Sequence, residues 1–467
     1  MDTPNTFASA QPRSASDSAA APLDAKTVLP SQSGWDDARR AWQLTVDQRP
    51  AAVVYPESAQ DVASAVRLAR ERRHRVAAQG TGHNAAPMGS LSDTLLLKTE
   101  RMRRVTIDAR PRIARAEAGA LSLEVVQAAA RHGLATVAGT SPDVGVVGYT
   151  IGGGIGVLSR RYGLAASNVH AIELVTADGR LVRADDEREP DLFWALRGGG
   201  GSFGVVAAIE LELFPLAEAY AGLLWYPPER ADEVLHAWRE LTQAAPPDEL
   251  STLGRFVNFP PIPEVPETVR GASFVIVDVY HAGDRARADE LLAPLRALGP
   301  VNDTIGTVSM PELSRVHMDA EQPVPAVGDG LMLAELPPEA LDAFIDIASA
   351  EGGRRLTVIE LRHLEGELGR AHSENGALTS IPAKYALIAG GFAPVPELVS
   401  ALRGEVEAIT RALAPWAAPY TYLNFAETRR DPASLWDAQA YRRLREVKSA
   451  VDPGDLIRSN HPIPPER

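Results

Sequence analysis

The run of residues 139–156 is the feature that most constrains what this chain can fold into. Seven of its eighteen residues are glycine. Glycine weakens helices and strands, and it opens backbone angles that are closed to other residues. Residues 79–84 and 197–204 share this glycine-rich composition. We therefore expect three loops that lie closely against something and together cradle one large anionic cofactor.

Composition limits the class of protein. A chain of 467 residues exceeds one ordinary core, so two or three domains are expected. The net charge of −14, from 61 acidic and 47 basic side chains, argues against a nucleic-acid partner, which usually needs a basic face. The absence of cysteine excludes disulfides, thiolate metal sites and a cysteine nucleophile.

The sequence gives no sign of a membrane or export segment. No apolar run approaches the length that spans a bilayer. The first residues are rich in Ala, Ser and Pro and lack the apolar centre of a secretory signal. We expect residues 1–33 to be a disordered leader, with an ordered arm as the alternative, and the protein to be cytoplasmic.

The first half of the chain predicts a series of short elements around the glycine loops. Ser58 is expected to cap a helix over 59–73, whose apolar positions share one face, and Ser122 a helix over 122–132. The segment 177–180 has the composition of a hairpin turn. The other expectations are a short helix in 34–45, strands at 49–56, 74–79, 95–98, 113–118, 169–176, 181–184 and 205–214, and a helical turn at 191–196.

Residues 218–415 change character, because the glycine loops stop and amphipathic helices alternate with apolar strands. This pattern predicts a second α+β domain with one sheet and helices on one face. The expected helices are 229–244, 285–298, 338–350 and 396–413, and the expected strands are 272–280, 356–361 and 385–390. A further helix is expected around 438–450, within a C-terminal segment of residues 416–467.

The first glycine loop superficially matches a dinucleotide fingerprint, with Gly80, Gly82 and Ala85 following a strand. That fingerprint needs a helix directly afterwards, so that pyrophosphate lies at the helix N-terminus. Pro87 and Gly89 follow too soon for such a helix to start. The loop can still bind phosphate through successive backbone N–H groups.

His83 is the most informative single residue of this loop. It is either a hydrogen-bonded turn residue or a nucleophile or ligand at the cofactor. No second histidine lies at metal-ligand spacing nearby, so we expect no metal site. Ser141 precedes a proline outside any strand–turn–helix elbow, so a hydrolase is disfavoured.

Taken together, these motifs resemble the flavin-dependent oxidases of the berberine bridge enzyme type, within the vanillyl-alcohol oxidase superfamily. The resemblance covers about half of the chain, over residues 46–217 and 420–465. Residues 80–84, 139–156 and 191–206 resemble the three cofactor loops of the family in order. The closing pattern follows in Tyr422-Leu-Asn424-Phe425, 444–448, Asp452-Pro453 and 460–465.

The resemblance implies an α+β fold with FAD as cofactor. A two-part FAD-binding domain of the PCMH type would span 46–217, a substrate domain with an antiparallel sheet covered by helices 218–415, and a segment returning to the FAD domain 416–467. The residues that would bind FAD are Gln79, Gly80, Thr81, Gly82, His83, Asn84, Ser141, Val144, Gly145, Gly148, Tyr149, Gly152, Gly153, Gly154, Gly156, Gly204, Val205, Val206, Asn424 and Asn460.

The resemblance also assigns individual roles. His83 would carry an 8α-histidyl bond to the flavin, and Ser141 stands where many members carry a second, cysteinyl bond. Because the chain has no cysteine, the flavin is attached at most once. Val144 falls where the family gates oxygen, and a small valine there is typical of an oxidase.

The catalytic base is left open by one departure. Phe425 occupies the position where many members have a tyrosine base, and it has no proton-accepting group. The candidates are Tyr422, Glu360 with the neighbouring Arg362, and Tyr385. Alternatively, Phe425 packs on the flavin and the base lies elsewhere, or substrate deprotonation needs no strong base.

The function expected from this resemblance is that of an oxidase. A hydride would move from an alcohol or C–N carbon of a small substrate, such as a sugar or secondary metabolite, to flavin, and the electrons would then reduce O₂ to H₂O₂. A dehydrogenase with another acceptor, a flavin-binding protein without catalysis, and a phosphate-sugar binding module are the alternatives. Substrate identity and oligomeric state do not follow from the sequence.

Overall fold

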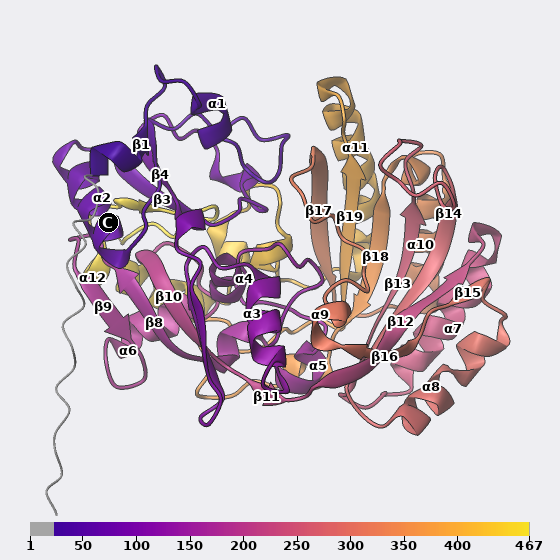
Figure 1. Cartoon of the computed structure of the whole chain (residues 1–467). Helices are drawn as coiled ribbons and strands as arrows, with labels where there is room; N and C mark the ends of the chain where they lie inside the picture. The colour runs from indigo at the N-terminus through magenta and orange to yellow at the C-terminus, as the bar shows by residue number, and fades with distance from the viewer. Residues whose placement is uncertain (1–22, 467) are drawn as a thin grey trace, which may run out of the picture.

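The computed structural model describes residues 23–466, which form two lobes lying side by side (Figure 1). The expected leader lies outside the described residues up to residue 22. From residue 23 on, the chain is ordered: a 3₁₀ turn at Leu23–Lys26 leads into strand β1 (Thr27–Val28), which pairs with β2 (Ala52–Val54). The short helix expected in 34–45 is limited to α1 (Trp35–Ala38).

One sheet of the first lobe is mostly parallel, and its last strand comes from the C-terminus. Its order is β1, β2, β4 (Thr94–Lys98), β3 (Arg75–Gln79) and β20 (Ile457–Arg458). Helix α2 (Ala59–Glu71) packs on it through buried Val62, Val66 and Ala69, and the Ser58 side chain accepts a hydrogen bond from the Asp61 amide, as expected for its cap.

The other sheet of this lobe is antiparallel, with the order β5 (Val105–Asp108), β6 (Ile113–Glu117), β10 (Val205–Glu212), β8 (Val169–Val175) and β9 (Leu181–Ala184). The predicted hairpin is confirmed, since β8 and β9 pair directly. A small sheet joins β7 (Leu134–Ala135) to β11 (Phe214–Pro215).

Short helices lie between these strands: α3 (Ser122–Ala130), α4 (Val146–Ile151), α5 (Ser159–Tyr162) and α6 (Pro190–Leu196). Ser122 is not the cap of α3, which corrects the sequence prediction. Leu121 precedes the helix, and its amide donates to the Glu124 carboxylate at 2.9 Å. Helix α4 lies within the glycine-rich run 139–156, whose composition did not predict a helix.

The second lobe is built on one antiparallel sheet of eight strands (Figure 1). The path is β15 (Asn302–Asp303), β12 (Glu218–Tyr226), β14 (Ser273–His281), β13 (Leu250–Asn258), β18 (Val358–His363), β19 (Tyr385–Phe392) and β17 (Ala326–Leu333), and β16 (Gly306–Ser309) also pairs with β12. Strands β12, β13 and β17 were not expected from the sequence.

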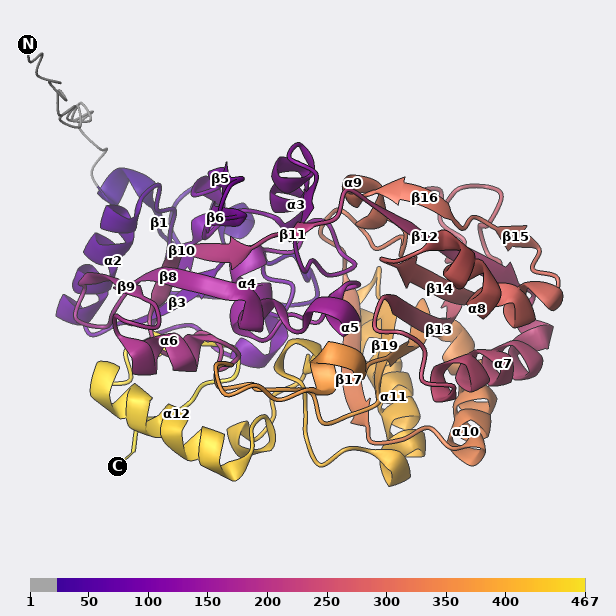
Figure 2. The ribbon, with the colours of Figure 1, turned by 90° about the horizontal axis from the view of Figure 1, so that it is seen from below.

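Four helices cover one face of this sheet, and its other face is turned toward the first lobe (Figure 2). They are α7 (Ala231–Gln243), α8 (Arg285–Ala297), α10 (Pro338–Ser349) and α11 (Pro396–Leu413), and α9 (Met310–Leu313) lies at the edge of the sheet. Trp238, Phe344 and Tyr385 are fully buried between these helices and the sheet. This arrangement confirms the expected α+β fold, with an antiparallel sheet covered by helices.

Single turns of 3₁₀ helix connect many of these elements. They are Ala86–Met88, Thr99–Arg101, Ala165–Asn168, Pro228–Arg230, Gly353–Arg355, Gly366–Gly369, Ala414–Trp416, Leu423–Phe425 and Pro432–Ser434. The turn at Ala86–Met88 follows the first glycine loop where a dinucleotide fingerprint would need a full α-helix. Among the described residues, no helix combines the length and hydropathy needed to cross a membrane.

The C-terminal segment returns to the first lobe through α12 (Ala438–Val451) and β20. Lys448 of α12 is fully buried, and its ammonium donates to the carbonyls of Ser202 and Ile457 at 2.9 and 3.0 Å and to Asp452 at 2.5 Å. The lysine thus joins the third glycine loop, α12 and the edge of the parallel sheet.

Replacing Lys448 with methionine is expected to lower the free energy of unfolding by about 3–5 kcal/mol, because Asp452 would remain as an unpaired buried charge. Urea unfolding measures this loss. Lys384→Met, at an exposed lysine, is the matched control. Lys448→Met combined with Asp452→Asn should recover part of the loss, and equal stability of Lys448→Met and wild type would contradict this role.

Candidate functional site

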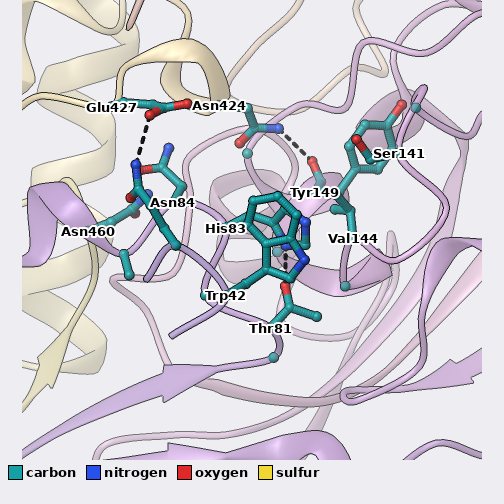
Figure 3. A pocket seen from close by; sticks show the side chains of 18 of the residues that line it. Trp42, Thr81, His83, Asn84, Ser141, Val144, Tyr149, Asn424, Glu427 and Asn460 are labelled. Carbon is teal, nitrogen blue, oxygen red and sulfur yellow. Dashed lines mark hydrogen bonds between the residues drawn. The ribbon is translucent and has the colours of Figure 1, made fainter. Parts of the chain in front are cut away.

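A cavity of about 690 Å³ lies between the two lobes. Its walls come from the three glycine loops, from the uncovered face of β17, β18 and β19, and from the C-terminal segment. The elements of both lobes and of the chain terminus therefore meet at one place (Figure 3).

Most residues that the sequence assigned to cofactor binding line this cavity. They are Gln79, Gly80, Thr81, Gly82, His83, Asn84, Ser141, Val144, Gly145, Gly148, Tyr149, Gly152, Gly204, Val206, Asn424 and Asn460. Gly153, Gly154, Gly156 and Val205 lie outside the lining. Gly154 has a φ of +77°, and a Cβ there would meet Ala165 at 2.6 Å, so this glycine serves the packing of the loop.

The size and the polar groups of the lining fit a large ligand with hydrogen-bonding groups. A cavity of this size lies within the range of small-molecule and cofactor sites. Buried polar atoms of Gln79, His83, Asn84 and Tyr149 indicate such a ligand, since none of these atoms has a hydrogen-bond partner among residues 23–466. At Gly148 a Cβ would meet nothing within 4 Å, so the missing side chain leaves free cavity space beside the loop.

His83 is held in a defined orientation. Its Nδ1 lies 2.7 Å from Thr81 Oγ1, and its ring stacks on Trp42 with 3.9 Å between the ring centroids (Figure 3). Its Nε2 approaches Asp143 Oδ1 to 3.3 Å, outside hydrogen-bond geometry, and Trp42 Nε1 donates to the other oxygen of Asp143 at 2.6 Å. Sequence reasoning missed Trp42 and Asp143, because their contacts with His83 span separate segments.

The C-terminal motif closes the cavity against the second glycine loop. Asn424 donates to the Tyr149 carbonyl at 2.9 Å, and the Tyr422 hydroxyl accepts from the Ile155 amide at 3.1 Å. A Cβ at Gly152 would lie 1.9 Å from Asn424 Oδ1, so only glycine permits this approach. Burial raises the pKa of Tyr422 well above its usual value, against its hydrogen bonds with the Ile155 and Gly154 backbone and with Asn424.

The three candidates for the base are separated by the structure. Tyr422 lines the cavity, whereas Glu360 and Tyr385 do not. Tyr385 lies in the core of the second lobe, with its hydroxyl 2.6 Å from Thr242 and accepting from Gln243 at 2.7 Å. Glu360 lies behind Arg362, whose Nε donates to it at 2.6 Å and whose guanidinium lies over the Phe425 ring.

Glu360 belongs to a buried network that reaches the cavity at Ser141. His317 Nε2 contacts Glu360 at 2.9 Å and its Nδ1 contacts Asp319 at 2.8 Å, and Ser141 Oγ donates to Asp319 at 2.6 Å. The Arg255 side chain joins the network by donating to the His317 carbonyl at 3.0 Å, and it pairs with buried Asp278. The network therefore connects the second glycine loop to β13, β14 and β18.

The charges of this network balance when His317 is protonated, since Arg255, His317 and Arg362 face Asp278, Asp319 and Glu360. Burial lowers the pKa of His317, but Asp319 and Glu360 outweigh it and raise the value to about 9. Burial likewise opposes ionisation of Glu360, yet Arg362 and His317 lower its pKa to about 2. The same kind of pairing holds the pKa of Asp319 well below its usual range against burial.

Glu427 and Asp319 are the carboxyl groups that line the cavity within residues 23–466, and sequence reasoning identified neither. Asp319 belongs to the His317-Met-Asp319 segment, which carries no recognisable motif. Glu427 follows Phe425 by two residues. Its position directly after the closing motif is the sequence feature that could have identified it. Burial, followed by the charge of Asp329, raises the pKa of Glu427 to about 7.

Comparisons with known proteins find similarity to FAD-linked oxidoreductases. Residues 50–185 match the FAD binding domain family. The chain is 29% identical over 461 residues to (R)-6-hydroxynicotine oxidase of Paenarthrobacter nicotinovorans, covering 95% of this chain and 97% of that one. It is 33% identical over 211 residues to glucooligosaccharide oxidase of Sarocladium strictum, covering 44% and 42% of the two chains.

Solved structures give the same result for the fold. The crystal structure of 6-hydroxy-D-nicotine oxidase from Arthrobacter nicotinovorans superposes with a TM-score of 0.80 at 27% identity, over 96% of this chain and 100% of that one. Berberine bridge enzyme from Eschscholzia californica shares the fold with a TM-score of 0.78 at 20% identity, over 94% and 97%. FAD, predicted from the sequence, is thereby confirmed as the cofactor.

Gly148→Ala is expected to weaken FAD binding by about tenfold or more, because the new methyl group would enter cavity space while touching no protein atom. In a His83→Ala background, where the flavin is expected to be dissociable, flavin absorbance per protein after equilibration with limiting FAD measures the loss, and the melting temperature of the apoprotein should not change. Gly404→Ala, at an exposed position of α11, is the control. Unchanged flavin content would contradict the placement of FAD in this cavity.

His317→Gln is expected to remove a pH dependence of stability. The pKa of His317 is about 9 in the folded state and about 6.5 when unfolded, so its stabilisation is complete below pH 6.5 and is lost as pH rises through 9. Between pH 6.5 and 10, the free energy of unfolding of the wild type should fall by about 2–3 kcal/mol more than that of the variant. Urea unfolding across this range measures it, with exposed His132→Gln as control, and parallel curves for all three proteins would refute the assignment.

Proposed function

Since this chain is an FAD-linked oxidoreductase, we propose that it is an oxidase that acts on an alcohol or C–N carbon of a small organic substrate and uses O₂ as its acceptor. FAD, when bound, supplies the two-electron chemistry, taking a hydride from the substrate carbon and passing the electrons to oxygen. A sugar or a secondary metabolite is the proposed substrate class, in keeping with the named activities of the relatives. We also propose a cytoplasmic location.

The observation that carries this proposal is the shared cavity. The glycine loops, Arg362 of β18 and Asp319 line this one cavity. A substrate held between them would lie against the cofactor, with Arg362 and Asp319 able to hydrogen-bond its polar groups. The apolar residues Ile388 and Phe425 complete the wall and limit water at the reacting carbon.

Val144 lies in the cavity wall between Ser141 and Gly145. Its small side chain supports the use of oxygen, because it leaves room beside the loop. A dehydrogenase, which passes the electrons to another acceptor, is the alternative in the same chemical class.

Peroxide measurement under air tests the proposal. The purified yellow protein is incubated with a panel of oligosaccharides, secondary alcohols and cyclic amines, and both flavin bleaching without oxygen and H₂O₂ formation with oxygen are followed. An oxidase bleaches and then forms peroxide equal to the substrate consumed. Bleaching without peroxide, together with reduction of an added dye, would identify a dehydrogenase instead.

We further propose that FAD is attached once, through His83. The ring is oriented by Thr81 and Trp42 at the cavity edge, and its Nε2 lacks a hydrogen-bond partner in the chain. Ser141 cannot form a thioether, and its hydroxyl is engaged with Asp319.

His83→Ala is therefore expected to convert covalent flavin into dissociable flavin, with near-complete loss of colour from the acid-precipitated protein. In wild type, the flavin absorbance should stay with the precipitate, and the intact mass should include one FAD. Exposed His170→Ala should behave as wild type. Free flavin in the supernatant of acid-treated wild type would refute the covalent bond while leaving the oxidase proposal standing.

A further inference from the structure

Glu427 is a partly buried acid in the cavity wall for which the expected chemistry gives no role. It lies on the C-terminal segment, two residues beyond Phe425, where the cavity is also lined by Gln43, Gly328 and Asn460. Its Oε2 accepts a hydrogen bond from Gln43 Nε2 at 3.0 Å (Figure 3). The carboxyl group is thus oriented by a neutral donor, and no cation pairs with it in the part of the chain that the structure describes.

The group behind Glu427 is a second carboxylate. Asp329 of β17 accepts hydrogen bonds from Arg430 at 2.5 Å, from Thr428 at 2.7 Å and from the Glu427 amide at 3.2 Å. Arg430 therefore stabilises the charge of Asp329 rather than that of Glu427. Burial and then Asp329 raise the pKa of Glu427 to about 7, against the smaller effects of Gln43 and the Gly328 backbone.

The remaining charged and titratable groups around Glu427 do not offset this effect. His461, which contacts the Ala426 carbonyl at 3.0 Å, has its pKa lowered first by burial and is neutral at pH 7. Arg429 of the same segment is exposed to solvent. Gln43, the nearest donor from the N-terminal segment, carries no charge.

The other acids of the cavity are poor proton acceptors at neutral pH. Burial raises the pKa of Tyr422 well above its usual value, so its hydroxyl stays protonated at neutral pH. Asp319 is an anion engaged with His317 and Ser141, and its pKa lies well below the usual range. A general base works best with a pKa near the operating pH, and among these carboxyl and phenol groups only Glu427 meets that condition.

We propose that Glu427 is a catalytic base, whose carboxylate accepts the O–H or N–H proton of the substrate as the adjacent C–H bond breaks. The inference rests on the proposed oxidase function. The heteroatom loses its proton to a Glu427 oxygen, the carbon loses a hydride to FAD, and a C=O or C=N bond forms. Two electrons and two protons then reach O₂, which becomes H₂O₂, so the balance needs no further reactant.

The kinetic test is Glu427→Gln, which keeps the shape of the side chain and its ability to accept from Gln43. For wild type, kcat/KM should rise with pH and level off above pH 7, since the base must be ionised. In the variant, kcat/KM should be about 100-fold lower at pH 8, and it should not show the rise with pH below pH 7. Glu446→Gln, at an exposed position of α12, is the matched control and should retain both the rate and the pH profile.

A second measurement does not depend on turnover. Infrared spectroscopy of the holoprotein should show a protonated carboxyl band that disappears with a midpoint near pH 7, is absent in Glu427→Gln and is present in Glu446→Gln. Flavin absorbance and circular dichroism should match in all three proteins.

The outcomes separate this inference from the proposed function. A wild-type protein that forms peroxide, with a Glu427→Gln variant of unchanged rate and pH profile, would overturn the base and leave the oxidase in place. The absence of the infrared band, or loss of flavin from the variant, would also overturn it, the latter indicating a structural residue. A wild-type protein that no substrate bleaches would overturn both proposals.

Discussion

The contact between the C-terminal motif and the second glycine loop is the constraint on which the rest of the site depends. Asn424 reaches the Tyr149 carbonyl across Gly152, and Tyr422 reaches the Ile155 amide. These bonds bring residues more than 260 positions apart to one cavity wall. Because Phe425 and Glu427 follow directly, their positions in the wall depend on the same contact.

The sequence predicted the elements whose signals are local. The α2 helix, the β8–β9 hairpin and α11 are encoded by a cap, a turn and an amphipathic face, and all three lie where expected. Strands β12, β13 and β17 were missed. The residues of β12 and β13 are buried almost throughout, so these two strands lack the alternation that identifies a strand from sequence alone. Strand β17 is the last strand of the sheet and is buried only in part.

For the site, the glycine loops were predictable because glycine permits close approach wherever it occurs. The polar groups opposite them were not. Asp319 acquires its importance from Ser141, a residue 178 positions earlier, and Glu427 from Asp329, 98 positions earlier. Burial and pairing decide whether a carboxyl group is a fixed anion or a proton acceptor, and both follow from tertiary contacts that spacing along the chain does not reveal.

The hydrogen bond between Ser141 and Asp319 has a consequence for how cofactor attachment can change. A thiol at position 141 would stand beside a carboxylate that stays ionised, and a nearby negative charge disfavours the thiolate needed for nucleophilic attack. Cysteine at that position alone would therefore be a poor second anchor. A covalent bond from position 141 would therefore also require a change at Asp319, and that change would remove a partner of His317.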